Sequence, residues 1–537
     1  MTDIDTQKDK EVTSVQPPAP AKKKIVLRRS AVASTSVLND PLKYEVQIIS
    51  KPTSDETTTT TTTPNLNTFN NCDHKRARIL SAKYLTKFDN VELGSIKRVI
   101  EIKLDLENDV HYQPGDYISV FSPNPHVVVD RLLARLDLND GEQIIVITTA
   151  TTTTPTVAAT TNTVTLPVNL QRASGRSIRY LLTNELDICG IVPKRLLRLL
   201  GELATDEQEK SVLLKSATIE GKDIYAKFLE ERVNLLSLLE RFPSVKPPSI
   251  QHLIEIISPQ APRDYSICSS PLIDPTKASF VFSVVDYPNV DGKHIYGLCT
   301  TWLESICKDN QLLISSSQLD DNNNNLESTL SRLSLTNDDK QQQQQQPVYI
   351  PYNFKSSPHF HLPTDCLAKP IIMIGPGTGV APFIGFLQHL EILNKRHDKD
   401  NNNNNNNNET WLFFGCRSET KDFIYQKEFN QFLENNTLKH LVTAFSRELS
   451  EQSSTKDVTL GYVQEKIKNH SKALFDLMHT GGAYVYICGD AKGMSVGVRQ
   501  SFIEIIKEQL DITDDNSASE IWVNWSKEKR YLLDVWS

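Results

Sequence analysis

The sequence predicts two folded units, one of the α+β class and one of the α/β class. From about residue 76, short alternating segments separated by Pro and Gly predict a small antiparallel β-barrel. At about 177–257 the apolar period becomes that of helices, which predicts a helical lobe inserted into the barrel. From residue 367, apolar strands alternate with helices, which predicts a doubly wound parallel-sheet domain.

Within the barrel unit, Gln113-Pro114-Gly115-Asp116 predicts a turn between strands, and residues 127–136 have the pattern of a short helix. The strands, identified by alternating apolar residues, are expected at 77–85, 96–104, 117–121, within 143–168, from Arg263 onward and at 280–287. The lobe carries leucines at helical spacing, and we assign no chemistry to it.

The parallel-sheet unit begins with Pro370-Ile371-Ile372-Met373-Ile374, a continuous apolar run typical of a strand buried on both faces. Gly375-Pro376-Gly377-Thr378-Gly379 follows, and then a helix through about residue 394. The loop departs from the Gly-x-Gly-x-x-Gly spacing, but its glycines permit close approach and the next helix offers free N–H groups to a phosphate. Further strands are expected at 411–415, 441–445 and 483–488, and helices at about 423–435, 462–475 and 492–510.

Homopolymer runs shorten the part of the 537-residue chain that can form a core. Such runs cannot bury enough apolar surface to offset their ordering entropy, so we expect disordered surface insertions. They are the Thr runs at 57–63 and 151–154, the Asn runs at 322–325 and 401–408, and the Gln run at 341–346. The expected units are a disordered tail at 1–75, a barrel domain at 76–366 with an insertion at about 316–350, and a parallel-sheet domain at 367–537.

Composition excludes several classes of protein. The net charge of -8 and the pI near 5.9 argue against nucleic acid as the main partner. Eight cysteines and twelve histidines show no metal-ligand or disulfide spacing, which favours reduced thiols in a cytoplasmic protein without a metal. Residues 370–390 lack charge, but the glycine-rich centre would break a membrane helix, so no membrane association is expected.

Two segments of the barrel unit have the residue types of a flavin site. Arg263 suits a pyrophosphate, Tyr265 offers a ring to a flat cofactor, and Ser266 offers a hydroxyl to the reactive ring edge. In Gly297-Leu298-Cys299-Thr300, the glycine permits close approach to a phosphate where a helix begins. Either segment alone is weak evidence, because an isolated Arg-x-Tyr-Ser is more often an ordinary strand.

The parallel-sheet unit offers matching groups for a nicotinamide dinucleotide. Ser446-Arg447, just after a strand, suits a 2′-phosphate and favours NADPH over NADH, and Tyr462 and Gln464 can add a ring and an amide. The alternative is a surface arginine and a core tyrosine. Cys488 closes a strand, where a buried structural cysteine is the default interpretation. Near the end of the chain, Trp536 is costly to leave in water and Asp534 can orient a polar neighbour.

Taken together, these motifs resemble the FAD/NADPH-binding half of the diflavin reductase family, with its ferredoxin-NADP reductase-like fold. Within that family the resemblance is strongest to the methionine synthase reductases, and it spans about 76–537 apart from the insertions. The motifs are Tyr112-Gln113-Pro114-Gly115-Asp116, Arg263-Asp264-Tyr265-Ser266, Gly297-Leu298-Cys299-Thr300, the 375–383 loop, Ser446-Arg447, Tyr462-Val463-Gln464, Cys488-Gly489-Asp490 and the terminal 534–537 segment, with Phe360-His361-Leu362-Pro363, Trp411 to Arg417 and Lys529 to Leu532 for the subgroup.

The resemblance implies a role for each site residue. The FAD set is Arg263, Asp264, Tyr265, Ser266, Gly297, Leu298, Cys299 and Thr300, with Tyr287 near the adenine. The NADPH set is Thr378 near the pyrophosphate and Ser446, Arg447, Tyr462, Val463 and Gln464 at the 2′-phosphate end. Ser266, Cys488 and Asp534 form the polar set around hydride transfer, and Trp536 covers the flavin ring.

Three features depart from the family pattern. We expect no flavodoxin-like FMN domain before residue 76, Leu460 stands where many relatives carry a lysine, and Gly497 replaces a common aspartate. The implied function is an NADPH-dependent FAD reductase that serves methionine synthase directly or through a flavodoxin-like electron carrier. Two alternatives stay open: an NADPH reductase for another acceptor (ferredoxin, flavodoxin, a heme protein or a sulfite reductase partner), or a redox-inactive NADP-binding scaffold protein.

Overall fold

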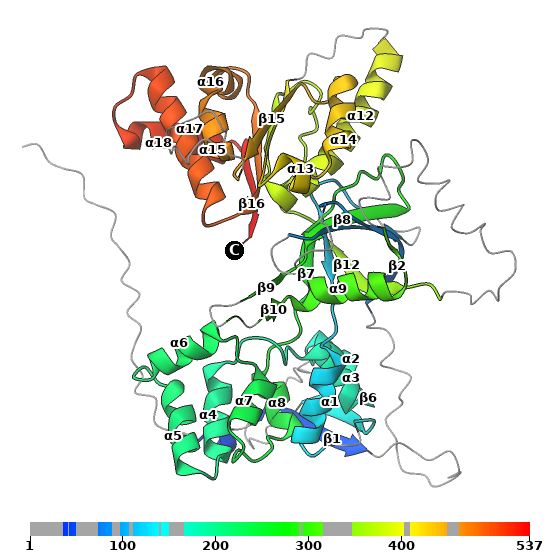
Figure 1. Ribbon diagram of the computed structural model, residues 1–537, viewed down its shortest axis with the longest axis vertical. Helices are drawn as coiled ribbons and strands as arrows, with labels where there is room; N and C mark the ends of the chain where they lie inside the picture. The colour runs from blue at the N-terminus through cyan, green and yellow to red at the C-terminus, as the bar shows by residue number, and fades with distance from the viewer. Residues whose placement is uncertain are drawn as a thin grey trace, which may run out of the picture.

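The computed structural model comprises three bodies, which Figure 1 shows as a parallel-sheet domain at the top, an antiparallel sheet in the middle and a helical lobe below. The Thr, Asn and Gln runs lie outside the described residues, apart from Gln346 and Asn401. The structure describes residues 36–40, 42–49, 74–87, 97–106, 111–138, 141–149, 166–288, 292, 294–314, 346–401, 409–447 and 461–536.

The middle body is an antiparallel sheet in the order β7-β4-β12-β2-β3-β8, with the short β11 paired in parallel to β2. Its strands are β2 (Lys75–Tyr84), β3 (Val99–Asp105), β4 (Tyr117–Val120), β7 (Arg263–Ser266), β8 (Lys277–Ser283), β11 (Leu313–Ile314) and β12 (Tyr349–Lys355). The antiparallel arrangement is confirmed, but among the described residues no ladder closes the predicted barrel. The two edge strands meet beyond the end of β7, through an isolated bridge between Ile267 and Phe280 and a hydrogen bond from the Cys268 N–H to the Ser279 carbonyl oxygen at 2.8 Å.

Alternation along β3 explains why this sheet forms. Ile100, Ile102 and Leu104 are fully buried, whereas Glu101 and Lys103 point to the other face. Helix α9 (Leu298–Asp309) adds Leu303 and Cys307 to this core, which lies between the helix and the sheet. The ribbon of β9 (Asp286–Pro288) and β10 (His294–Tyr296) leads into the helix. The N-terminus of α9 is therefore held beside β7 and β8.

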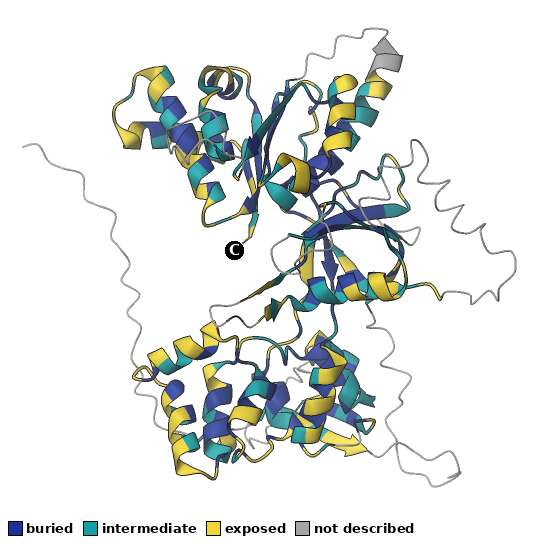
Figure 2. Cartoon of the chain, viewed as in Figure 1, coloured by how far each residue is buried: buried dark blue, intermediate teal, exposed yellow. Residues whose placement is uncertain are grey.

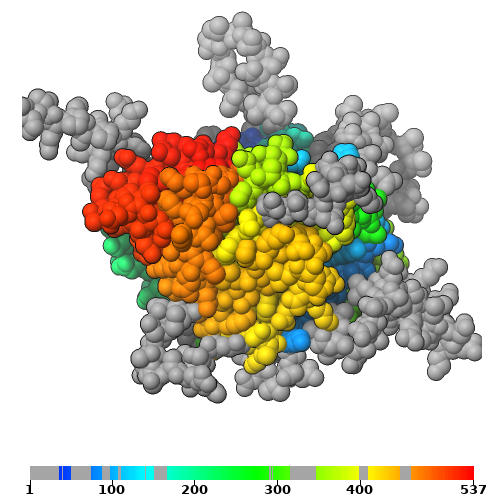
Figure 3. Space-filling view, turned by 90° about the horizontal axis from the view of Figure 1, so that it is seen from above, coloured from blue at the N-terminus to red at the C-terminus, as the bar shows by residue number. Residues whose placement is uncertain are grey.

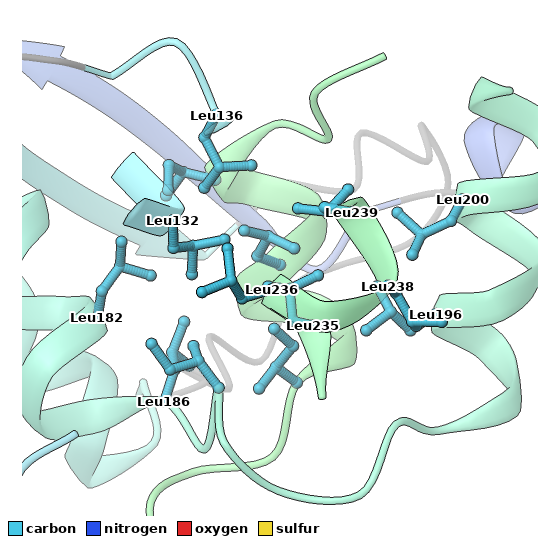
Figure 4. Close-up of a cluster of buried hydrophobic side chains, with 14 of the residues drawn as sticks. Leu132, Leu136, Leu182, Leu186, Leu196, Leu200, Leu235, Leu236, Leu238 and Leu239 are labelled. Atoms are coloured by element: carbon cyan, nitrogen blue, oxygen red, sulfur yellow. The ribbon is translucent and has the colours of Figure 1, made fainter. Parts of the chain in front are cut away.

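The helical lobe has its own leucine-rich core, part of which Figure 4 shows. It begins earlier than the predicted residue 177, because α1 contributes Val129, Leu132 and Leu133 to that core. Its helices are α1 (His126–Arg135), α2 (Val168–Ala173), α3 (Ile178–Tyr180), η3 (Leu181–Glu185), α4 (Lys194–Leu203), α5 (Glu207–Ser216), α6 (Lys222–Glu230), α7 (Leu235–Arg241) and α8 (Ile250–Ile256).

The prediction of disorder through residue 75 is wrong for 36–40 and 42–49. The short helix η1 (Val37–Asn39) places Val37 in the lobe core, where its N–H donates to Glu202 at 3.0 Å. Strand β1 (Tyr44–Ile49) pairs antiparallel with β5 (Ile144–Thr149), which pairs with β6 (Arg176–Ser177). The rest of the predicted tail up to residue 73 lies outside the described residues.

The upper body is a doubly wound parallel sheet in the order β15-β14-β13-β16-β17, which confirms the predicted fold class. Its strands are β13 (Ile371–Ile374), β14 (Thr410–Cys416), β15 (His440–Phe445), β16 (Tyr484–Asp490) and β17 (Tyr531–Trp536). Successive residues of β13 point to opposite faces: Ile371 and Met373 join one core, and Ile372 and Ile374 the other. Figure 2 shows this sheet as buried strands between two layers of helix.

Helices cover both faces of this sheet. The first face packs on α12 (Ala381–Asn401), α13 (Glu419–Asp422) and α14 (Gln426–Glu434), and the second on α15 (Val463–Lys468), α16 (Ser471–His479), α17 (Met494–Leu510) and α18 (Asp515–Lys527). Sequence analysis missed α18 and joined α15 to α16. In the view of Figure 3, from above, this domain forms the near face of the molecule. Among the described helices, none is long and apolar enough to cross a membrane.

The two sheets share one apolar interface. Cys268 and Phe360 of the middle body pack in the same core as Phe383 and Phe386 of α12. Gly385 of α12 lies so close to β7 that an added Cβ would be 3.3 Å from the carbonyl oxygen of Ile267. This contact fixes the carboxyl edge of the parallel sheet against the end of β7.

Candidate functional site

Four side chains from both sheets meet at this junction. Asp534 accepts hydrogen bonds from Ser266 Oγ at 2.7 Å, Tyr117 Oη at 2.9 Å and Cys488 Sγ at 3.5 Å. Strand register explains the convergence: Cys488 is the partner of Asp534 in β16 and β17, and Tyr117 is the partner of Ser266 in β4 and β7. The predicted set of Ser266, Cys488 and Asp534 is therefore brought together, and Tyr117 joins it.

The protonation of this cluster follows from burial. Burial raises the pKa of the Cys488 thiol well above its usual range, and the adjacent Asp534 carboxylate raises it further. Burial and the same carboxylate also raise the pKa of the Tyr117 hydroxyl. Both groups keep their protons near neutral pH, so each can donate to Asp534.

Trp536 lies at the open edge of this cluster. It follows Asp534 by two residues on β17, so its side chain leaves the same face of the strand. The residue is 47% exposed, and its carbonyl oxygen accepts the N–H of Ala491 at 2.9 Å. Figure 1 marks the C-terminus beside β16. A flat ligand that stacked on the Trp536 indole would lie beside Asp534 and the Ser266 hydroxyl that donates to it.

The turn at Gly297 forms another side of the candidate flavin site. An added Cβ at Gly297 would lie 2.6 Å from Thr300 Oγ1 and 2.7 Å from Val285 Cβ, so only glycine fits. The Val285 N–H donates to Thr300 Oγ1 at 3.1 Å, which holds the turn. No side chain caps the N-terminus of α9, which begins at Leu298, so its first N–H groups can donate to an anion.

Arg263 and Tyr265 lie on β7, beside this turn. Arg263 is exposed and uses one Nη1 donor on the carbonyl oxygen of Ala261, at 2.7 Å. The Tyr265 ring packs 5.2 Å from the ring of Phe280, and its hydroxyl lies beside the buried Cys299 thiol. An uncapped helix, an exposed guanidinium and a glycine cradle together fit the pyrophosphate of a dinucleotide.

Two other predicted FAD residues are engaged by protein groups. Asp264 accepts from Ser119 Oγ at 2.6 Å and from Lys355 Nζ at 2.5 Å, so it braces β7 against its neighbours. Tyr287 is 43% exposed on β9, and its hydroxyl accepts from Arg232 Nη2 of the lobe at 3.1 Å. The ring of Tyr287 is thus held at the surface, in reach of a ligand.

The glycine loop occupies the carboxyl edge of the parallel sheet, where open α/β sheets bind ligands. An added Cβ at Gly379 would lie 2.2 Å from the carbonyl oxygen of Cys488, so the loop packs directly on the end of β16. Gly377 has φ +57°, and Thr378 is half-buried in the 3-10 turn η4 (Gly377–Val380) that leads into α12. Phosphates bound by this loop would lie close to Cys488.

The predicted 2′-phosphate residues gather at the end of β15. The N–H groups of Ser446 and Arg447 donate to the carbonyl oxygens of Cys416 and Arg417, both at 2.9 Å. Two exposed arginines therefore lie side by side. An added Cβ at Gly461 would lie 2.8 Å from Ser446 Cα, which shows how closely the next segment approaches.

That segment carries the remaining predicted NADPH residues. Tyr462 is 52% exposed at the start of α15, whereas Val463 is buried in the core behind it. The Gln464 side chain lies over Gly497, where an added Cβ would be 2.9 Å from Gln464 Cγ. Gln464 thus fills space that a larger residue at 497 would need. Leu460 lies outside the described residues.

Lys97 is a further candidate that sequence analysis missed. It precedes β3 in the middle body, yet its Nζ lies 3.1 Å from the position of an added Cβ on Gly377. Burial lowers the pKa of Lys97, and the nearby charge of Arg417 lowers it further. A polyphosphate at the glycine loop would lie next to both cations. No local pattern marks Lys97, because the loop that it approaches belongs to the other domain.

Comparison with known proteins agrees with this architecture. Residues 73–302 match the family model of the FAD binding domain, and residues 373–500 that of the oxidoreductase NAD-binding domain. Methionine synthase reductase of Homo sapiens is 34% identical over 447 residues, which cover 82% of this chain and 59% of that relative. NADPH--cytochrome P450 reductase of Dictyostelium discoideum is 30% identical over 501 residues, 93% of this chain and 62% of that relative.

The chain therefore spans less than two thirds of the length of these relatives. Both matched domains occur here in the order in which the sequence motifs appear. The first match includes β2, β3, β4, β7 and β8 of the antiparallel sheet, and the second includes most of the parallel sheet apart from β17. On this evidence the chain contains an FAD-binding domain and an oxidoreductase NAD-binding domain, and over this part it is similar to the two reductases.

Proposed function

We propose that this protein is an NADPH-dependent FAD reductase that passes electrons to a protein acceptor. The observation that carries the proposal is the convergence of Ser266, Cys488 and Asp534 from two sheets at the end of the glycine loop. When bound, FAD supplies the redox chemistry, because it accepts a hydride from NADPH and releases electrons singly.

The proposed FAD-binding residues differ in the part of the cofactor that each contacts. Arg263 and the N-terminus of α9, which begins after Gly297, bind the pyrophosphate, and Tyr265 and Tyr287 border the cofactor along β7 and β9. Trp536, which is 47% exposed, would cover the face of a bound flavin when no nicotinamide is bound. Excluding water there strengthens every electrostatic contact of the cluster.

The NADPH side chains form a basic cluster at the carboxyl edge of the parallel sheet. Arg447, with Ser446 and Tyr462, takes the 2′-phosphate end, and Thr378 and Lys97 take the pyrophosphate. Asp534 holds Ser266 and Cys488 in place, where they would face a bound nicotinamide, and its carboxylate would stabilise positive charge that develops there.

For the physiological acceptor we propose methionine synthase, reached directly or through a separate flavodoxin-like carrier. The proposal draws on the names and identities of the relatives, 34% for methionine synthase reductase and 30% for a P450 reductase. The narrow difference makes another acceptor, such as a heme protein, the second candidate. We place the protein in the cytoplasm, since the scattered spacing of its cysteines along the sequence favours reduced thiols.

The test is an anaerobic titration of the FAD-loaded protein with NADPH, followed by visible absorbance. Loss of the oxidised flavin spectrum with one equivalent of NADPH supports the reductase. Protein that binds NADP⁺ but stays oxidised would instead be the redox-inactive scaffold. Adding methionine synthase, a flavodoxin or a heme protein to the reduced sample then identifies the acceptor, because only a true partner restores the oxidised spectrum rapidly.

A further inference from the structure

Asp534 has two carboxylate oxygens, and different donors occupy them. Ser266 and Cys488 both donate to Oδ2, whereas Tyr117 alone donates to Oδ1 at 2.9 Å. Asp534 itself is only 8% exposed. The carboxylate plane is therefore set by bonds on both sides, and removing the Oδ1 bond leaves it free to turn.

We propose that Tyr117 is a positioning residue for hydride transfer, which anchors the second oxygen of Asp534 so that Ser266 and Cys488 keep their orientation toward the reacting atoms. The proposal rests on the reductase function proposed above. It assigns a role to a residue of β4 that is not among the residues proposed to bind FAD or NADPH.

The geometry of β4 makes Tyr117 a rigid anchor. Its backbone is paired on both sides, with Ser266 of β7 and with Lys355 of β12. The Lys355 ammonium lies over its ring, 5.8 Å from the centroid, and is tied to Asp264 at 2.5 Å. The hydroxyl also interacts with the buried Ser357. A side chain held on so many sides can fix a carboxylate from the other domain.

The charges around the hydroxyl keep it a donor. The titratable groups that face it are the Asp534 carboxylate of β17, the Cys488 thiol of β16 and the Lys355 ammonium of β12. Burial and the negative charge of Asp534 raise the pKa of Tyr117, so the phenol stays protonated through the neutral range. A bond from a neutral donor to a carboxylate is among the stronger hydrogen bonds in proteins.

Tyr117→Phe tests the proposal, because it removes only the hydroxyl. We expect flavin reduction by NADPH to slow about tenfold, while the dissociation constant of NADP⁺ and the flavin content stay unchanged. A primary isotope effect with 4-deuterated NADPH should persist or grow in the variant. Equal rates in wild type and variant, or a loss confined to NADPH binding, would overturn the proposal.

A double-mutant cycle separates positioning from general damage. If Tyr117 acts through Asp534, then adding Tyr117→Phe to Asp534→Asn should change the reduction rate less than about twofold. A full tenfold further loss in that background would show that the hydroxyl acts elsewhere, against the proposal. The two proposals fail in different ways. Wild-type protein that NADPH does not reduce would refute the reductase function itself, whereas a refuted role for Tyr117 leaves wild-type reduction intact.

Tyr425→Phe is the matched control. Tyr425 is buried at the domain interface and, like the half-buried Tyr117, donates to a carboxylate, in this case Glu101 at 2.5 Å, but it does not touch the Asp534 cluster. Both variants should lower the urea midpoint of unfolding to a similar extent. Only Tyr117→Phe should slow reduction at saturating NADPH. Equal slowing by both would mean that the effect comes from the interface in general, and would refute the assignment.

Discussion

Lys97 gives the sharpest prediction for the nucleotide site. Its ammonium lies 3.1 Å from the position that a Cβ on Gly377 would occupy, beside the loop that we assign to the pyrophosphate. Lys97→Met keeps the length of the stem and removes the charge. Because a hydrogen bond to a charged group contributes about 1.5–3 kcal/mol, the KM for NADPH should rise about 10- to 150-fold, with the reduction rate at saturation nearly unchanged.

The same residue predicts a pH dependence with a definite sign. Burial and Arg417 lower the pKa of Lys97 in the free protein, so the ammonium is lost at lower pH than for an exposed lysine. Only the charged form attracts a phosphate, and NADPH affinity should therefore fall as pH rises into the alkaline range. The Met variant should lack this fall.

The assay is the KM for NADPH and the dissociation constant of NADP⁺, each measured across neutral to alkaline pH. Lys103→Met is the control, since Lys103 is an exposed lysine of β3, the strand that Lys97 precedes. An unchanged KM in Lys97→Met, or the same alkaline fall in both variants, would refute the placement of phosphate beside Lys97.

Two further predictions concern the framework of the site. Gly379→Ala places a Cβ 2.2 Å from the carbonyl oxygen of Cys488. It should weaken NADP⁺ binding, measured by nucleotide titration, and lower the free energy of unfolding by about 1–3 kcal/mol, measured by urea denaturation. NADP⁺ binding as tight as in the wild type would contradict the packing of the loop on β16. Arg98→Met leaves the largely buried carboxylates of Glu304 and Asp286 without the guanidinium that they share. The free energy of unfolding in urea should therefore fall by about 3 kcal/mol. A fall below about 1 kcal/mol would contradict this and show that Lys308, which also pairs with Glu304, compensates.

The parallel-sheet domain was the easier half to predict from sequence. The apolar run of β13 and the glycine loop after it are local signals, and they specify a buried parallel strand and a phosphate-binding turn without knowledge of the neighbours. The antiparallel sheet was predicted as a barrel because short alternating strands have the same pattern in closed and open sheets. Closure depends on how β7 and β8 meet, which no local pattern encodes.

The candidate site could also be predicted only in part from local sequence patterns. Ser266, Cys488 and Asp534 were identified by residue type and motif, and strand register brings them together. Tyr117 was read only as part of a strand, because its partner Asp534 lies 417 residues away. The lobe strand β1 was missed for a related reason: its partners are β5 and a carboxylate of α8, and it stands among Lys-, Pro- and Thr-rich segments of the predicted tail.

The central claim is that nicotinamide meets the flavin at the Ser266–Asp534 junction. Single-turnover reduction of FAD-loaded protein by NADPH, in wild type and in Ser266→Ala and Asp534→Asn, tests it most directly. We predict that both variants bind FAD and NADP⁺ normally and are reduced at least about tenfold more slowly, because both lose a contact made during transfer. Wild-type rates in both variants would contradict the claim and place hydride transfer elsewhere.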